Sequence, residues 1–435
     1  MEKKDIIVRL FAISLIVSSG AWATPPSSAS SADTYSFLRA VVNNVLASNP
    51  EFEALKAKLE ATQAKLGGTS LPLYNPTLDV EIEGADENNF SLGLTQALDW
   101  HDKQLGRQGV QQTELRIAEA ELAHLSMNLA SNMLTAVAAY YNALDVSELH
   151  EKRVMLLNQI VKIAEQRLAA GDINKSEVLL ARLSLADAVI EQANQSTNVI
   201  QAQKTFYILS QQNIEPRSAF VMNVPDSIGN DTTVEALAGQ HPLEQIALLQ
   251  IEQSRQDVRL ARSERRADPE LGIKIGKDGE DALLGVQFSL PWQIRNNLSY
   301  TVNIAQKSQL QTEFLAQHTH RKIVAEIRAA KTQYQVIAKA WKLWMSNGES
   351  QLKEHIELLE QRWNSGELST TDYLVQFEQN LHTQIAGVEL KGNVWQTWFQ
   401  WLNASAQVLT WLNLDNEHLT NGAQTTIGKA NVYPK

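Results

Sequence analysis

The chain of 435 residues is 44% hydrophobic and 20% charged, so it is long and apolar enough to bury a large core. It contains no cysteine, which excludes disulfides and thiolate metal sites and argues against an amino-terminal lipid on cysteine. The formal net charge of -11 makes nucleic acid an unfavourable partner, because an acidic surface repels a polyanion.

The first residues predict an export signal. Its basic start, apolar run and small-x-small cleavage pattern are supplied by Lys3, Lys4 and Arg9, by residues 10–17 and by residues 21–23. We therefore expect residues 1–23 to be removed. No later stretch approaches the ~20 apolar residues that a membrane helix needs, so we expect any membrane crossing to use strands.

The chain then repeats itself with a spacing of about 193 residues, which indicates a duplicated unit. The matched landmarks keep their order along the chain: Asn49-Pro50 and His241-Pro242, Pro76 and Pro269, Trp100 and Trp292, Gly171 and Gly366. We expect the first repeat to cover residues 24–228 and the second to cover residues 229–412. A closing polar segment follows at residues 413–435.

Each repeat carries one predicted β-hairpin, at residues 76–98 and at residues 269–291. The apolar residues that alternate with polar or small ones are Leu78, Val80, Ile82, Phe90, Leu92 and Leu94, and then Leu271, Ile273, Ile275, Leu284, Val286, Phe288 and Leu290. Strands of about nine or ten residues with one apolar and one polar face are typical of transmembrane β-strands. A soluble hairpin packed on helices shares this alternation.

If these strands span a membrane, their apolar face meets lipid. Trp100 and Trp292 then lie at the membrane interface, where tryptophan is enriched. Four strands are too few to close a barrel, and open strand edges are not tolerated in hydrocarbon. The hypothesis therefore requires that the chain oligomerise.

Two proline-free tracts predict long antiparallel helical hairpins, at residues 103–210 and at residues 297–411. Apart from Gly109 and Gly348, no strong breaker interrupts the outbound helix of either hairpin. Each outbound helix is therefore expected to reach ~65 residues, or roughly 100 Å.

Heptad seams are predicted along these helices, because apolar residues step by three and four. On the return helix of the first hairpin the seam comprises Leu179, Leu183, Ala186, Ile190, Ala193, Thr197 and Ile200. An ordinary coiled coil shares this pattern.

Each helical hairpin turns at a matched glycine element. The glycine suits a helix stop, and the Asn or Ser that follows can cap the next helix. The two copies consist of Arg167, Gly171, Asp172, Ile173 and Asn174 and of Arg362, Gly366, Glu367, Leu368 and Ser369.

Together, the export signal, the duplicated helices, the strand pairs and the glycine turns resemble the TolC-like outer-membrane efflux proteins over residues 36–412. The stretches at residues 241–276 and 284–297 are most similar to the branch that includes heavy-metal efflux channels. The resemblance implies a mainly α fold with a small transmembrane β portion. Three chains would form one twelve-stranded barrel that continues into an α-helical tunnel through the periplasm.

The resemblance also implies partners. The chain would form a homotrimer in outer-membrane lipid. It would also bind a periplasmic adaptor (membrane-fusion) protein and work with an inner-membrane pump, often of the resistance-nodulation-division type. The adaptor would contact the ten residues of the two glycine turns. The polar segments at residues 211–235 and 413–435 would form a belt around the middle of the tunnel.

The family often narrows the tunnel entrance with acidic side chains beyond the second glycine turn. Asp372 matches that place, and Glu177 is its counterpart in the first repeat. Three copies of Asp372 around a threefold axis would form a negative ring that attracts cations. A second acidic ring of some members falls at Val375, so the chain departs from that pattern.

Other residues carry weaker hypotheses. His318 and His320 point to different faces of a helix and lack a third ligand, so solvated surface is favoured over a metal site. The near-helical spacing of Trp395, Trp398 and Trp401 favours packing between helices over contacts with a sugar or quinone. No nucleophile–base pair or phosphate loop emerges, so we predict no enzyme, no metal site and no cofactor.

The sequence therefore predicts a passive export channel of the outer membrane that extends into the periplasm. Two alternatives remain open. A periplasmic adaptor carries one long helical hairpin between lipoyl-like and β-barrel segments, and a structural coiled-coil protein of the cell envelope needs only the heptads. Two matched helical hairpins with two strand pairs favour the channel.

Overall fold

A computed structural model describes residues 31–84, 88–213, 228, 233–278, 281–292 and 295–414. The predicted export signal at residues 1–23 lies outside the described residues. So do the turn at residues 85–87 and most of the segments 211–235 and 413–435. The belt expected from those two segments stays a prediction.

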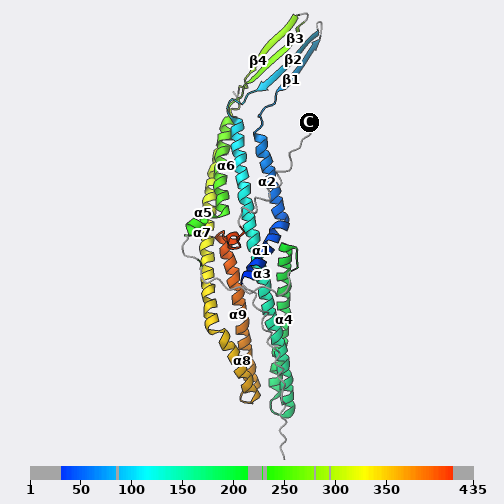
Figure 1. The fold of residues 1–435 in the computed structure, drawn as a ribbon, viewed down its shortest axis with the longest axis vertical. Helices are drawn as coiled ribbons and strands as arrows, with labels where there is room; N and C mark the ends of the chain where they lie inside the picture. Colours follow the sequence, from blue (N-terminus) through cyan, green and yellow to red (C-terminus); the bar gives the residue numbers. More distant parts are fainter. Residues whose placement is uncertain are drawn as a thin grey trace, which may run out of the picture.

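The chain forms an elongated molecule with a small sheet at one end and two helical turns at the other (Figure 1). The first half contains α1 (Ser31–Ser48), α2 (Pro50–Thr69), β1 (Thr77–Gly84), β2 (Asn88–Ala97), α3 (Lys103–Ala170) and α4 (Lys175–Ser210). The second half contains α5 (Val234–Gln240), α6 (Pro242–Glu264), β3 (Glu270–Asp278), β4 (Asp281–Ser289), α7 (Ser299–Asn347), α8 (Glu349–Asn364), α9 (Thr370–Ala404) and α10 (Val408–Trp411). The same order of helices and strands thus occurs twice, as the sequence repeat predicts, except that the outbound helix of the second half is in two pieces, α7 and α8, and that the short α10 follows α9.

The duplication extends to backbone conformation. Asp102 before α3 and Leu298 before α7 both have φ of 54°, and Gln211 after α4 and Ala406 after α9 have φ of 56° and 57°. Left-handed backbone is uncommon for residues other than glycine. Its recurrence at the same two places in each half supports two copies of one unit.

The sheet is an antiparallel meander in the order β1-β2-β3-β4, so the two predicted hairpins are present and lie side by side. Its register forms two apolar rows that cross all four strands: Leu78, Leu94, Ile273 and Val286, and then Val80, Leu92, Ile275 and Leu284. All of these side chains except Leu92 are exposed. The opposite face carries Asp79, Glu81, Ser91, Thr95, Lys274 and Gln287, with Glu81 and Lys274 forming an ion pair.

The first long helical hairpin has the predicted form, with α3 as one helix of 68 residues and α4 returning along it. The second differs, because its outbound helix is broken at Gly348 into α7 of 49 residues and α8 of 16 residues. The prediction of one helix of ~65 residues there is wrong. A Cβ on Gly348 would lie 2.6 Å from the Trp344 indole, so glycine admits the ring at this kink.

Two hydrophobic clusters hold the helices together. The larger lies at mid-height, where α9 packs against both α3 and α7 and where α1 and α10 pack against α3, and it buries Met133, Tyr334, Trp395 and Phe399. The smaller lies near the helical turns and buries Leu157, Trp363, Leu374 and Phe377. The protein is thus packed along much of its length without a single central core.

The return helix α4 packs on α3 through small buried residues, Val178, Ala181 and Ala188. The seam predicted for this packing faces outward instead, and its exposed members include Leu179, Leu183, Ile190 and Ile200. Small side chains let α3 and α4 approach closely. The large apolar side chains of the predicted seam are therefore left on the surface of the chain.

Candidate functional site

The two glycine turns lie next to each other at the end of the molecule remote from the sheet (Figure 1). One joins α3 to α4, and the other joins α8 to α9. The structure therefore brings together residues that are far apart in the sequence, as the family resemblance implies.

The first turn stops α3 with a left-handed glycine. Gly171 has φ of +84°, which L side chains rarely adopt. The Gly171 N–H donates to the Leu168 carbonyl at 3.0 Å, and the Asp172 N–H donates to the Arg167 carbonyl at 2.9 Å. This pair of bonds is the Schellman motif, which satisfies the last carbonyl groups of a helix.

The second turn repeats this geometry. Gly366 has φ of +77°, its N–H donates to the Trp363 carbonyl at 3.2 Å, and the Glu367 N–H donates to the Arg362 carbonyl at 3.0 Å. No atom lies within 4 Å of a Cβ placed on either glycine. Backbone conformation, and not crowding, therefore demands glycine at both turns.

Both predicted entrance carboxylates also accept a hydrogen bond from the side chain that caps their helix. The Asn174 side chain accepts a hydrogen bond from the Glu177 N–H at 3.1 Å and donates to the Glu177 carboxylate at 3.1 Å. Likewise, the Ser369 hydroxyl accepts from the Asp372 N–H at 3.1 Å and donates to the Asp372 carboxylate at 2.7 Å. Each carboxylate thus stabilises the first turn of its return helix in addition to any role at an entrance.

The two matched arginines differ in their contacts. Arg167 donates from Nη2 to the Trp363 carbonyl at 3.0 Å, and its guanidinium lies 4.8 Å from the centre of the indole ring. Arg362 instead forms a local ion pair with Glu367 at 3.8 Å, with both side chains exposed. Only the first of the two arginines therefore joins the two helical hairpins within the chain.

Within the second hairpin, Trp363 links Arg167 to a stack of aromatic rings. Its ring stacks on Tyr373 with centroids 4.5 Å apart and an interplanar angle of 9°, and Tyr373 stacks in turn on Phe377. Burial, with a smaller contribution from Glu360, raises the pKa of Tyr373 to about 12. The phenol is therefore neutral at physiological pH, and the stack packs as an apolar unit.

Most other residues of the glycine turns lie on the surface. Leu368 is buried and Ile173 is half-buried. The exposed members are Gly171, Asp172, Asn174, Arg362, Gly366, Glu367 and Ser369. A partner that approaches this end would meet a polar tip with two glycines at its apex.

Sequence reasoning missed a second bridge near the turns. Arg153 on α3 pairs with Asp187 on α4 at 3.0 Å and with Glu378 on α9 at 2.7 Å, and its side chain is only 13% exposed. Burial raises the pKa of Glu378, and Arg153 offsets part of that shift. No motif marks these three residues, because the bridge depends on which helix faces meet in three dimensions.

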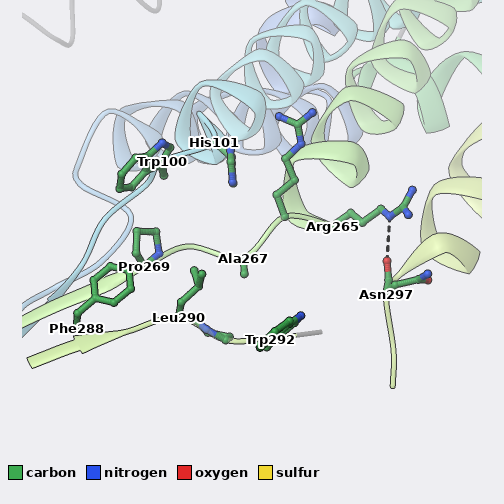
Figure 2. Close-up of a pocket in the computed structure, with 11 residues that line it drawn as sticks. Trp100, His101, Arg265, Ala267, Pro269, Phe288, Leu290, Trp292 and Asn297 are labelled. Atoms are coloured by element: carbon green, nitrogen blue, oxygen red, sulfur yellow. Dashed lines mark hydrogen bonds between the residues drawn. The ribbon is translucent and has the colours of Figure 1, made fainter. Parts of the chain in front are cut away.

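At the other end of the molecule, Trp100 and Trp292 border the same hollow (Figure 2). Both are exposed, at 67% and 87%. The hollow lies where the sheet joins the helices, which is the place that the sequence predicts for aromatic residues of a membrane interface. The two repeats thus contribute one tryptophan each to one surface feature.

A small cluster of polar side chains connects the sheet to the helices beside this hollow. Asp268 pairs with Lys103 at 2.9 Å and accepts a hydrogen bond from the Tyr74 hydroxyl at 2.7 Å. Burial, followed by the bond to Asp268, raises the pKa of Tyr74 to about 12. The phenol therefore remains protonated and donates to Asp268 at physiological pH.

The weaker hypotheses have mixed outcomes. His320 lies 3.1 Å from a Glu244 oxygen, but no group of three His, Cys, Asp or Glu suited to a metal occurs among the described residues. Trp395, Trp398 and Trp401 are buried, so their predicted packing role is confirmed. Across the described part of the chain, every helix is too short or too polar to cross a membrane.

Comparison with solved structures identifies the fold. The outer-membrane channel CmeC of Campylobacter jejuni superposes with a TM-score of 0.73 at 18% identity, covering 89% of this chain and 90% of that one. CusC, solved in a study of transmembrane channel formation, gives 0.73 at 14% identity over 85% and 91%. The open state of the MtrE outer-membrane channel of Neisseria gonorrhoeae gives 0.71 at 13% identity over 86% and 89%.

No protein-family model matches the sequence, and no curated protein matches it either. The chain nevertheless has the TolC-like fold, and its elements account for nearly the whole length of these channels. The predicted fold class, with duplicated helical hairpins and two β-hairpins, is confirmed.

Proposed function

We propose that the protein is an outer-membrane channel that conducts substrate passively from the periplasm to the exterior. The sheet carries this proposal, because one whole face exposes apolar rows and the other bears charged, polar and small residues. The helices lie beyond the end of the sheet and not across its face (Figure 1). Such a wall suits lipid on one side and an aqueous lumen on the other.

The edges of the sheet require other chains. β1 and β4 each pair on one side only within the described residues. An unpaired strand edge in hydrocarbon leaves backbone N–H and C=O groups without partners, at a cost of several kcal/mol for each. In a homotrimer, β4 of each chain pairs with β1 of the next, and the three sheets close a twelve-stranded barrel.

The surface of the helices is also consistent with a trimer. The outward seam of α4 exposes Leu183 by 68% and Ile190 by 61%, and Ile304 and Phe314 are exposed by 65% and 60% on α7. Monomers rarely leave so many large apolar side chains in contact with water. Packing between neighbouring chains would bury these residues and complete an α-helical tunnel through the periplasm.

The two glycine turns would then ring the periplasmic entrance. Three copies of Asp372, with Glu177 nearby, would place negative charge around the threefold axis and favour cations. Arg167 and Arg153 tie the two helical hairpins of each chain together. Opening the entrance would separate these hairpins, so both bridges are expected to oppose it.

An adaptor and a pump complete the proposed system. The polar tip formed by the glycine turns would contact the hairpin of a periplasmic adaptor, and an inner-membrane pump of the resistance-nodulation-division type would supply the energy. The stretches at residues 241–276 and 284–297 favour the heavy-metal efflux branch. We assign the chain no catalytic role.

Two other functions predict different behaviour. A periplasmic adaptor or a coiled-coil scaffold would be released in aqueous extracts and would not conduct ions. The exposed apolar rows of the sheet argue against both.

Electrical recording tests the proposal. The purified protein, added to a planar lipid bilayer, should produce stepwise conductance, and in detergent it should migrate as a heat-sensitive trimer. A heat-denatured sample of the same preparation is the control. A water-soluble monomer that produces no steps would contradict the proposal.

A further inference from the structure

The hollow at the junction of sheet and helices has the features of a lipid site. Its volume is about 620 Å³, within the range of small-molecule pockets. Figure 2 shows Trp100 and His101 on one side of it, Phe288, Leu290 and Trp292 on another, and Arg265 at its far end. Apolar and cationic groups therefore meet in one surface feature.

The apolar wall of the hollow continues the outer face of the sheet. Phe288 follows Leu284 and Val286 at alternate positions of β4, so these three side chains point to the same side, and Leu290 comes directly after the end of the strand. All four are exposed, as is Trp292 beyond them. A hydrocarbon chain lying on the sheet could therefore extend into the hollow without crossing a polar surface.

The cationic side is formed by two arginines at the end of α6. Arg265 donates from Nε to the Asn297 carbonyl at 3.1 Å, which leaves its terminal amino groups available. Among the described residues, neither Arg265 nor Arg266 forms an ion pair. Two acidic side chains at this junction are already paired, Glu264 with Arg107 and Asp268 with Lys103, whereas Asp102 and Glu270, next to the lining residues His101 and Pro269 in the chain, form no ion pair among the described residues.

We propose that this hollow binds an anionic phospholipid of the periplasmic leaflet. The headgroup phosphate would accept hydrogen bonds from Arg265 and Arg266, and an acyl chain would lie along Phe288, Leu290 and Trp292. Guanidinium groups suit phosphate oxygens because they offer several donors in one plane. This inference rests on the proposed function, because it needs the sheet to lie in a membrane.

The charge of the site selects among lipids. The headgroup of phosphatidylglycerol has no positive charge to oppose the arginines, whereas the choline of phosphatidylcholine does. Two basic residues near a membrane surface are expected to favour the anionic lipid by about tenfold to thirtyfold.

Native mass spectrometry of the purified protein in detergent tests this preference. Equal amounts of dioleoyl phosphatidylglycerol or dioleoyl phosphatidylcholine are added, and the fraction of lipid-bound protein is measured. The double variant Arg265→Gln/Arg266→Gln should lose most of the preference for phosphatidylglycerol. Arg259→Gln/Arg262→Gln is the matched control, because it removes the same charge from exposed positions of α6 that do not line the hollow.

A second variant tests the apolar wall. Trp292→Ala should weaken the binding of both lipids while keeping the preference for phosphatidylglycerol, since it leaves the arginines in place. Circular dichroism of each variant checks that the fold is intact. Equal binding of both lipids by the unaltered protein would overturn the inference, as would an equal loss in the matched control.

Conductance separates this inference from the proposed function. A protein that forms channels in planar bilayers but binds both lipids equally contradicts only the lipid site. A protein that forms no channels and is a soluble monomer contradicts the proposed function itself.

Discussion

Arg167 on α3 donates a 3.0 Å hydrogen bond to the main-chain carbonyl of Trp363 on α8, and its guanidinium lies 4.8 Å from the centre of that indole ring. The two residues are remote in sequence and join the two helical hairpins beside their turns. The matched residue of the second repeat, Arg362, forms only an exposed local pair with Glu367. This difference between matched arginines provides an internal control for experiments at the proposed entrance.

Replacing Arg167 with glutamine should loosen the tip of the helical hairpins. A charge-assisted hydrogen bond and a cation–π contact are lost, at a combined cost of about 1–3 kcal/mol. Single-channel conductance in planar bilayers should rise, because the hairpins separate more readily. Arg362→Gln should change stability by less than about 0.5 kcal/mol and leave conductance unaltered. Equal effects of the two variants would remove Arg167 from the control of opening.

The charge of Asp372 can be separated from its capping role. Asp372→Asn removes the charge but keeps an oxygen beside the Ser369 hydroxyl, so the preference for cations over anions should fall in reversal-potential measurements. Ser369→Ala removes the cap and should cost about 1 kcal/mol of stability without altering that preference. If the cation preference of Asp372→Asn matches that of the unaltered protein, Asp372 does not line the entrance.

Glu378 should contribute a specific dependence of stability on pH. Burial raises its pKa above the usual 4.5, so the folded protein binds the proton more tightly than the unfolded chain. This contribution of Glu378 to stability is fully present below pH 4.5, and it is lost as the pH rises through the higher pKa of Glu378 in the folded state. Thermal denaturation of the unaltered protein, measured relative to Glu378→Gln, should therefore show a gain in stability on acidification. A constant difference would contradict this assignment.

Gly387 should be needed where α9 crosses α7. A Cβ at this position would come within 2.8 Å of the indole nitrogen of Trp344, so Gly387→Ala should destabilise the protein by about 1–3 kcal/mol. Gly67→Ala on α2 is the control, because no atom lies within 4 Å of its added Cβ. That control should be neutral or stabilising by up to about 1 kcal/mol. Thermal denaturation distinguishes the two, and a destabilised control would count against the packing argument.

Lysine substitutions at two adjacent residues of β4 should have opposite effects on retention of the protein in the outer membrane. Val286→Lys places an ammonium group on the apolar face, at a cost of about 2–4 kcal/mol if that face meets the middle of a bilayer. Gln287→Lys places the same group on the polar face. Fractionation should find Val286→Lys depleted from the outer membrane and Gln287→Lys retained there. Equal retention would show that the apolar face does not contact lipid.

Local patterns were sufficient to predict the elements of the fold. Alternation at Leu78, Val80 and Ile82 predicted a strand, and the glycine turns predicted where each helical hairpin reverses. These features depend on short-range sterics and on side-chain periodicity. The structure agrees with them, including the left-handed φ of Gly171 and Gly366.

Features that depend on contacts between distant residues were not predictable. The Trp344 ring at the kink also lies against Gly387 on α9, and the bridge from Arg153 to Glu378 requires α3 and α9 to face each other. The seam of α4 was assigned to the wrong partner, because periodicity identifies an apolar face but not the surface that covers it. The capping role of Asp372 could have been predicted, since Ser369 precedes it by three residues.

Cysteine cross-linking in native outer membranes tests the central claim that neighbouring chains share one barrel. The chain has no cysteine of its own, so Val80→Cys on β1 can be combined in turn with Leu284→Cys, Val286→Cys or Phe288→Cys on β4. Because β1 and β4 lie at opposite edges of the sheet, a disulfide can form only between chains. The account predicts a covalent trimer on oxidation for at least one combination. A monomer for every combination, recovered in the soluble fraction, would contradict it.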